Sequence, residues 1–287
     1  GLQYYELMPS AVVSHQDEGF LFTIKNDTAP VSFFASMDGD DMFSNEIADE
    51  NWAFGVFTNP KFGGVALDFV GAYFMGTQDA VTDATTGVVT SPEQDTNIYL
   101  LGAAVSVDAG MARIFAEMNF FGGEVNDTTD ATGLQGYVGA DLKVSDAVTI
   151  TPAFWYAQAA SAGEAQIVVF GNDFGGWDPA FDVGTKLDNE KIGLGRPFDW
   201  TGGGAGVIGA SLTSKFKVSD AVSLGAGINY LTTEDDAVVD DTLLGLVGGV
   251  SYKFMGNARI DAQIEYHDHD IDGADAIMGG IYLGVGF

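Results

Sequence analysis

One short segment near the carboxyl end gathers oxygen ligands of the kind that a hard cation needs. Residues 267–273 read His-Asp-His-Asp-Ile-Asp-Gly, with the Asp-x-Asp-x-Asp-Gly spacing that begins an EF-hand loop. Carboxylates at alternate positions can converge on Ca²⁺ while the glycine allows a tight turn. The twelfth position, where a bidentate Glu is expected, is Gly279. The segment predicts either an acidic hairpin tip or a weak Ca²⁺ site at Asp268, Asp270 and Asp272, and we expect no cofactor to be required.

Other kinds of site chemistry find little support in the residue types. The chain has no cysteine and three histidines, so it offers no thiol nucleophile and no zinc-thiolate site. The glycine-rich run Gly202–Gly206 enters a predicted strand rather than a helix, which excludes a phosphate-binding loop. A formal net charge of -30 would repel nucleic-acid phosphates. We therefore expect neither catalytic residues nor a nucleic-acid partner.

The elements that must position these residues are strands with one apolar face. In the segment 258–267, Ala, Ile, Ala, Ile and Tyr alternate with Arg, Asp, Gln, Glu and His. This period of two predicts a sheet that is apolar on one side and wet on the other. The same alternation recurs in 65–75, 112–120, 138–144, 208–218, 222–230 and 277–287.

The connections between these segments alternate in length. Short turns are predicted at 26–29, 59–62, 108–110, 145–147, 219–221 and 256–257. Longer polar connections are predicted at 38–51, 77–95, 122–132, 159–203, 232–241 and 269–275. The acidic residues crowd into the longer connections, whereas most of the eleven Lys and Arg residues lie near the short turns.

Phe287 closes the last alternating segment, and this ending resembles the closing strand of bacterial outer-membrane β-barrels. The rhythm of short and long connections resembles the same class, and in particular the porins. The resemblance implies an all-β fold: a transmembrane antiparallel up-and-down barrel of about 14 strands, with 12 or 16 as alternatives, short periplasmic turns and long acidic extracellular loops. It implies one domain over residues 1–287, in a bacterial outer membrane, in a mature form that lacks its signal peptide.

The face opposite the apolar one is expected to line a water-filled pore, because about fourteen strands enclose more space than side chains alone fill. The predicted pore-lining residues are Asp68, Arg113, Glu117, Asp141, Lys143, Lys215, Lys217, Lys253, Arg259, Asp261 and Glu265. The long connection 159–203 is rich in aromatic residues and is expected either to fold into the lumen as a constriction or to form an outer cap or a contact between subunits. Its candidate constriction residues are Lys186, Lys191, Arg196 and Trp177.

The resemblance implies a porin that passes ions and small polar solutes by diffusion, and the acidic loops favour cations. The implied partners are outer-membrane lipid and lipopolysaccharide, the solutes themselves and further copies of the chain in a trimer. One alternative is a non-conducting structural or adhesion barrel. Another is an outer-membrane protease similar to the omptins, with Asp38, Asp40, Glu265 and His267 only loosely echoing the spacing of that family.

Overall fold

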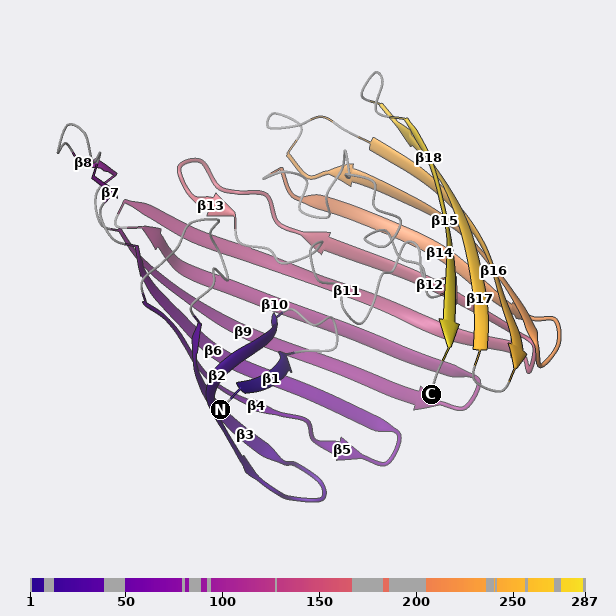
Figure 1. Ribbon diagram of the computed structural model, residues 1–287, viewed down its shortest axis with the longest axis horizontal. Coiled ribbons are helices and arrows are strands. Elements are labelled where there is room, and N and C mark those ends of the chain that lie inside the picture. The colour runs from indigo at the N-terminus through magenta and orange to yellow at the C-terminus, as the bar shows by residue number, and fades with distance from the viewer. Residues whose placement is uncertain are drawn as a thin grey trace. The chain divides into compact units, whose positions relative to one another are not determined.

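The structure is a computed structural model. It describes residues 2–7, 13–38, 50–78, 81–82, 89–91, 94–126, 128–166, 183–185, 205–235, 240, 242–255, 258–270 and 275–285. Within these ranges the regular elements are all strands, drawn as arrows in Figure 1. No helix in this part of the chain is long and apolar enough to cross a membrane.

The strands follow the alternating segments of the sequence. The first nine are β1 (Leu2–Leu7), β2 (Val13–Ile24), β3 (Val31–Asp38), β4 (Glu50–Thr58), β5 (Lys61–Phe62), β6 (Val65–Gln78), β7 (Val81–Thr82), β8 (Val89–Ser91) and β9 (Gln94–Ala109). The others are β10 (Ala112–Asn126), β11 (Thr129–Ser145), β12 (Val148–Ala157), β13 (Ala165–Gln166), β14 (Val207–Lys217), β15 (Val222–Thr233), β16 (Thr242–Met255), β17 (Ala258–His269) and β18 (Ala276–Val285).

Fourteen of these strands form an antiparallel up-and-down sheet in chain order, β1-β2-β3-β4-β6-β9-β10-β11-β12-β14-β15-β16-β17-β18. Short β5 pairs with β6, β13 pairs with β11 in parallel, and β7 and β8 form a separate two-stranded sheet. The predicted fold class is confirmed: an all-β chain with the up-and-down order of an outer-membrane barrel and the predicted strand number.

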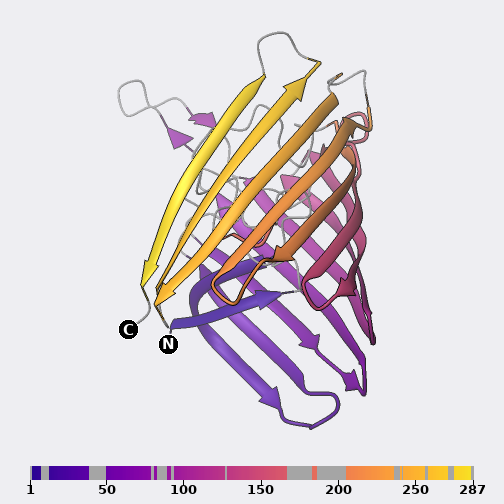
Figure 2. The ribbon, with the colours of Figure 1, turned by 90° about the vertical axis from the view of Figure 1, so that its right-hand side faces the viewer.

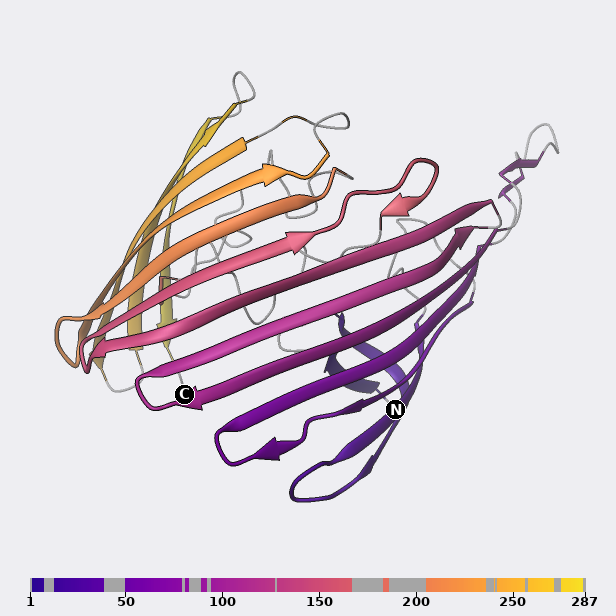
Figure 3. The same cartoon turned by 180° about the vertical axis from the view of Figure 1, so that it is seen from behind.

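The contacts within the chain fall into two compact units. The first comprises 1–105, 117–135 and 160–169, and the second comprises 106–116, 136–159 and 170–287. Strands β9, β10 and β11 contribute residues to both units, and the predicted single domain over residues 1–287 stays a prediction. In the first unit, β3, β4, β6 and β9 lie side by side (Figure 3).

In the second unit, β14 to β18 lie side by side in chain order (Figure 2). The register is continuous over most of their length, as in the pairing of β14 with β15, where Lys215 lies opposite Gly225 and Lys217 opposite Ser223. A strand paired in this way on both sides can satisfy its backbone N–H and C=O groups, which a membrane-spanning segment requires because lipid supplies no partners.

One face of the strands is apolar and exposed in both units, and we call the opposite one the inner face. Exposed side chains in the first unit include Phe20, Phe22, Phe33, Phe54, Phe69 and Met118. Those in the second unit include Leu212, Leu224, Ile228, Leu246, Ile264 and Ile281. These residues hold the outward positions of the alternating pattern, so the predicted lipid face is the one that the structure leaves uncovered.

Some expected connections differ from the structure. The segment 122–132, expected to be a long polar connection, instead continues β10 to Asn126 and begins β11 at Thr129. The hydrogen bonds of the paired strands extend further than the apolar pattern, because polar residues such as Thr129 and Asp130 hold strand positions as well. Pro9, the turn 256–257 and the terminal Phe287 lie outside the described residues.

An outward charge tests this assignment of faces. Ile228 lies at the middle of β15, is 45% exposed and points outward. Ile228→Arg is expected to lower the free energy of unfolding in lipid vesicles by about 2–4 kcal/mol, since a charge at mid-depth must leave water. Val144→Arg, outward but beside the turn after β11, should cost about 0–1 kcal/mol. Equal losses for the two variants in urea titrations would contradict the assignment.

Candidate functional site on the inner face of the second unit

The inner face of β17 carries an unbroken row of polar side chains. Asp261, Gln263, Glu265, His267 and His269 occupy alternate positions, and all are buried. The preceding inward position is Arg259. The period of two that places isoleucines outward at 260 and 264 therefore gathers two carboxylates, an amide and two imidazoles along a single strand.

Several of these neighbours pair with one another along the strand. Arg259 Nη2 donates to Asp261 Oδ1 at 2.5 Å, in an ion pair whose carboxylate side is fully buried. Gln263 Nε2 donates to Glu265 Oε1 at 2.6 Å, and His267 Nε2 lies 3.3 Å from Glu265 Oε2. Buried charges need partners of this kind, because isolating one from water costs several kcal/mol.

Part of the long connection lies against this row. In residues 183–185, Thr185 donates a hydrogen bond to Gln263 Oε1, and the carbonyl oxygen of Gly184 accepts one from Arg259 Nη2 at 3.4 Å. Val183 is 2% exposed. The short segment 183–185, which we call the docked segment, is thus held on the inner face of the strands by polar contacts and by burial.

Glycines on β15 and β16 make room for the docked segment. A Cβ at Gly225 would overlap the carbonyl oxygen of Val183 and lie 2.6 Å from the Val183 Cβ. A Cβ at Gly249 would lie 2.6 Å from Thr185 Cγ2 and 3.0 Å from Val183 Cγ2. The docked segment fills the space over these inward glycines. A similar fit occurs on β14, where a Cβ at Gly209 would overlap the indole of Trp155.

The two ends of the long connection are fixed at one acidic residue. Glu234 accepts hydrogen bonds from Tyr156 Oη and, at 2.5 Å, from the backbone N–H of Ala159, where the connection begins. The backbone N–H of Glu234 donates to the carbonyl of Ala205, where the connection ends, at 3.2 Å. Glu234 therefore closes the base of the connection 159–203.

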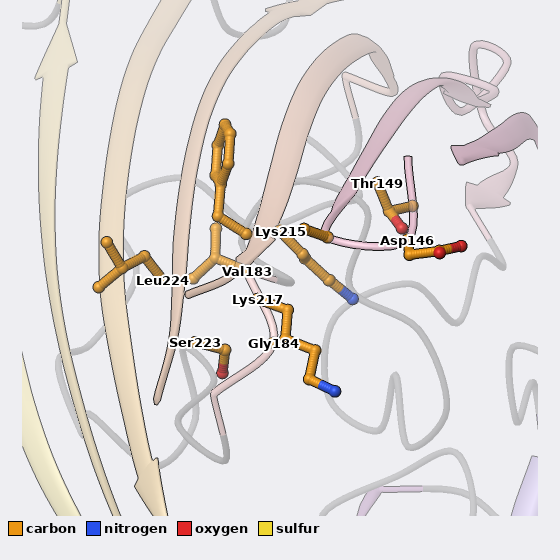
Figure 4. Close-up of a pocket in the computed structure, with 10 residues that line it drawn as sticks. Asp146, Thr149, Val183, Gly184, Lys215, Lys217, Ser223 and Leu224 are labelled. Atoms are coloured by element: carbon orange, nitrogen blue, oxygen red, sulfur yellow. The ribbon is translucent and has the colours of Figure 1, made fainter. Parts of the chain in front are cut away.

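A pocket of about 210 Å³ opens beside the docked segment, at the turn end of the strands (Figure 4). Its lining includes Lys215 and Lys217 from β14, Thr149 from β12, Ser223 from β15, and Gly184. Gly184 has a positive φ of 84°, and a Cβ there would lie 3.4 Å from Lys215 Cδ. The aliphatic stem of Lys215 thus runs along the docked segment, and we call this the lysine pocket.

The Lys217 ammonium also pairs with the turn that follows β14. It lies 2.6 Å from Asp220 Oδ1, and both side chains are largely exposed. The hydrogen bond from this ammonium, followed by its charge, lowers the pKa of the Asp220 carboxyl from its usual value. A pair this exposed exchanges readily with water and salt.

A further ion pair lies on β10 and β11. Arg113 Nη1 is 3.9 Å from Asp141 Oδ2, and Arg113 Nε donates to Ser106 Oγ at 2.9 Å. Asp141 Oδ1 also accepts a hydrogen bond from Thr151 at 2.8 Å. Lys143 and Lys253 hold inward positions at strand ends and are exposed.

In the first unit, Asp68 lies on the inner face of β6 and accepts a hydrogen bond from Asn59 at 2.5 Å. Glu117 is buried on β10 and accepts one from Asn119 at 2.6 Å. All the predicted pore-lining residues therefore hold inward positions. That this face lines a pore stays a prediction.

The inner face of the first unit is not polar as a whole. A buried apolar cluster occupies it, made of Phe34, Ala53, Val70, Ala72, Phe74, Ile98, Leu100, Ala104, Phe121 and Ala131. Partly buried Ala165 from β13 packs against it, so the start of the long connection lies over this face. The expectation of a uniformly polar interior missed this cluster. Adjacent apolar pairs such as Phe33-Phe34 and Phe120-Phe121 were the available signal, because neighbours in a strand point to opposite faces.

The remaining candidates fall partly or wholly outside the described residues. Lys186, Lys191, Arg196 and Trp177 lie outside them, as do Asp40 and Asp272. Asp268 and Asp270 are described and exposed. Within the described part of the chain, no group of three His, Cys, Asp or Glu residues gathers closely enough to hold a metal ion. The Ca²⁺ site stays a prediction.

Comparison with known proteins gives similarities of structure only. No protein-family model matches the chain, and no curated protein matches its sequence. Among solved structures it is similar to OmpT, an outer membrane protein of Vibrio cholerae, at 14% identity and a TM-score of 0.36, covering 94% of this chain. It is similar to the copper transporter OprC at 13% identity and a TM-score of 0.48, and the match also covers 94% of this chain. It is similar to the anion-selective porin from Comamonas acidovorans at 10% identity and a TM-score of 0.49. That match covers 96% of this chain and 79% of the porin chain.

The chain spans 65% of the length of OmpT and 49% of the length of OprC. At such similarity the class rests on the strands themselves: fourteen in up-and-down antiparallel order, with an exposed apolar face. Fourteen up-and-down antiparallel strands with one exposed apolar face are the arrangement expected of a transmembrane β-barrel.

The glycine at 225 gives a direct test of the docked segment. Gly225→Ala places a methyl group where the Val183 carbonyl lies, so the docked segment must leave the strands. We expect the amide hydrogens of 183–185 to exchange at least about tenfold faster, which corresponds to a loss of about 1.4 kcal/mol in local protection.

Gly248→Ala is the matched control for this substitution. Gly248 lies on the same sheet but faces outward, and the nearest atom to its added Cβ would be Ile264 Cγ2 at 4.0 Å. Exchange at 183–185 should remain at the wild-type rate in this variant. Unchanged exchange in Gly225→Ala would show that the docked segment does not depend on that glycine.

The Arg259–Asp261 pair yields a separate stability prediction. Arg259→Met leaves a fully buried carboxylate without its charged partner, and should lower the free energy of unfolding by about 3–5 kcal/mol. Adding Asp261→Leu should recover most of that loss. Lys143→Met, which removes an exposed inward cation, serves as the control and should change stability little. A single Arg259→Met variant as stable as the control in urea titrations would refute the role of this pair.

Proposed function

We propose that the protein is an outer-membrane porin that passes ions and small polar solutes by diffusion. The observation that carries this proposal is the polar row on the inner face of β17, together with Ser211, Thr213, Lys215 and Lys217 on that of β14, opposite an apolar exposed face on the same strands. Charged and amide groups on the inner side of a membrane-spanning strand require water or one another. The exposed lysines and the lysine pocket add charged groups to this inner face, in addition to the ion pair of β17.

The docked segment is proposed to narrow the path for solutes. It lies on the inner face, and the base of its connection is closed by Glu234. A segment that is fixed at the base of its connection and at Gln263 lies against the inner face of the strands and does not project away from it. We propose that the whole connection 159–203 acts as the constriction, with Lys186, Lys191, Arg196 and Trp177 as its candidate residues.

Cation preference is proposed from charge. The net charge is -30, and acidic residues crowd the longer connections, where they raise the local concentration of cations. Ca²⁺ bound at acidic loops, contacts with lipopolysaccharide and assembly into a trimer are proposals of the same kind, supported by the acidic composition and by the exposed apolar face.

A non-conducting structural barrel is the second candidate. The buried apolar cluster on the inner face of the first unit favours it, because such a cluster excludes water from part of the interior. The protease alternative gains less support. It needs an accessible carboxylate–imidazole pair, whereas Glu265 and His267 are both buried and lie against each other.

Conductance in planar bilayers distinguishes the candidates. Insertion of refolded protein into the bilayer is expected to raise the current in discrete steps. In a KCl gradient, the reversal potential should have the sign that indicates a preference for K⁺ over Cl⁻. The same preparation in liposomes should admit small polar solutes. Folded protein that gives neither steps nor solute uptake would refute the channel and favour the structural barrel.

A further inference from the structure

The lysine pocket gathers positive charge in a strongly acidic chain. The sequence has eleven Lys and Arg residues against 41 acidic ones. Two of the eleven, Lys215 and Lys217, stand at successive inward positions of one strand and line one pocket. Figure 4 shows both ammonium groups directed to the same side of β14, away from Leu224.

The strands on both sides add hydroxyl groups at the same level. Thr149 lies opposite Lys215 on β12, and Ser223 lies opposite Lys217 on β15. The pairing continues past the strand end, where the backbone N–H of Lys217 donates to the Ala147 carbonyl at 2.7 Å. Antiparallel register therefore brings two ammonium groups and two hydroxyls together, and all four can donate hydrogen bonds.

We propose that the lysine pocket binds the carboxylate or phosphate group of a small anionic solute. Ammonium and hydroxyl donors around a cavity of about 210 Å³ match the size and charge of such an oxyanion. The inference rests on the proposed channel for its biological meaning, since it names the solute class that would pause at this site. The binding itself does not depend on conduction.

Two carboxylates stand near the pocket and shape its affinity. Asp146 lies in its lining, and Asp220 pairs with Lys217. The side chain of Asp220 is 98% exposed and that of Lys217 is 57% exposed, so an entering anion exchanges one weak, solvated pair for another. Lys215 is the more enclosed of the two lysines, with its stem against Gly184, and it provides the fixed charge of the site.

A local anion site is compatible with acidic residues crowded into the longer connections. Charges on exposed loops act over about 8–10 Å at ordinary ionic strength, whereas the two ammonium groups act at contact. Ion selectivity and binding at the lysine pocket are thus separate properties, measured by separate experiments.

Binding is tested on refolded full-length protein by calorimetry, with inorganic phosphate and acetate as the two probes. Wild type should bind at least one probe saturably, and the double variant Lys215→Gln/Lys217→Gln should raise the dissociation constant at least about tenfold. The probe that binds more tightly identifies phosphate or carboxylate as the preferred group. Neither probe binding to wild type, or equal binding to the double variant, would overturn the proposal.

Lys25→Gln/Lys61→Gln is the matched control, because it removes the same charge from two exposed lysines at other turns. Its dissociation constant should equal that of wild type, and an equal rise in both double variants would mean that net charge alone attracts the anion. Current recordings on the same preparations separate the two proposals. Binding without current steps would refute the channel and support the anion site. Current steps without binding would support the channel and refute the anion site.

Discussion

The structure depends on one constraint: a strand in lipid must pair all of its backbone groups with neighbouring strands while presenting apolar side chains outward. Between neighbouring strands the up-and-down order meets the first requirement, with continuous antiparallel register such as that of β14 with β15. The period of two in the sequence meets the second requirement, because it places apolar side chains on the outward face. Because the period is two, the same requirement fixes what lies on the inner face, and a shift of one residue would exchange the two faces.

Close packing on the inner face follows from small residues at inward positions. Gly209 accommodates the indole of Trp155, while Gly225 and Gly249 accommodate the docked segment. Hydrogen bonds from Thr185 and Arg259 then hold that segment against the polar row of β17. The lysine pocket on this face is therefore built jointly by strands and by the docked segment, since Gly184 lies against Lys215.

Much of the fold was predictable from sequence, because alternation is a local property. Residues 258–267 and 222–230 form β17 and β15 with the predicted faces, and the inward positions of Arg259, Asp261 and Glu265 follow directly. The apolar cluster around Phe34 and Phe121 was not predicted, since an apolar residue at an inward position lowers the contrast between faces. The docking of Val183 on Gly225 was also beyond prediction, because it joins residues distant in sequence through shape alone.

The central claim is that the two faces of each strand meet different solvents, and the chain's lack of cysteine makes it directly testable. Single cysteines would be placed along β15 and at the lysine pocket, in protein reconstituted into lipid vesicles. A charged, water-soluble thiol reagent should modify cysteines at Ser223 and Thr149, which line the pocket, and spare those at Ile228 and Tyr230, which point outward. Equal modification of the outward and inward positions would contradict the account.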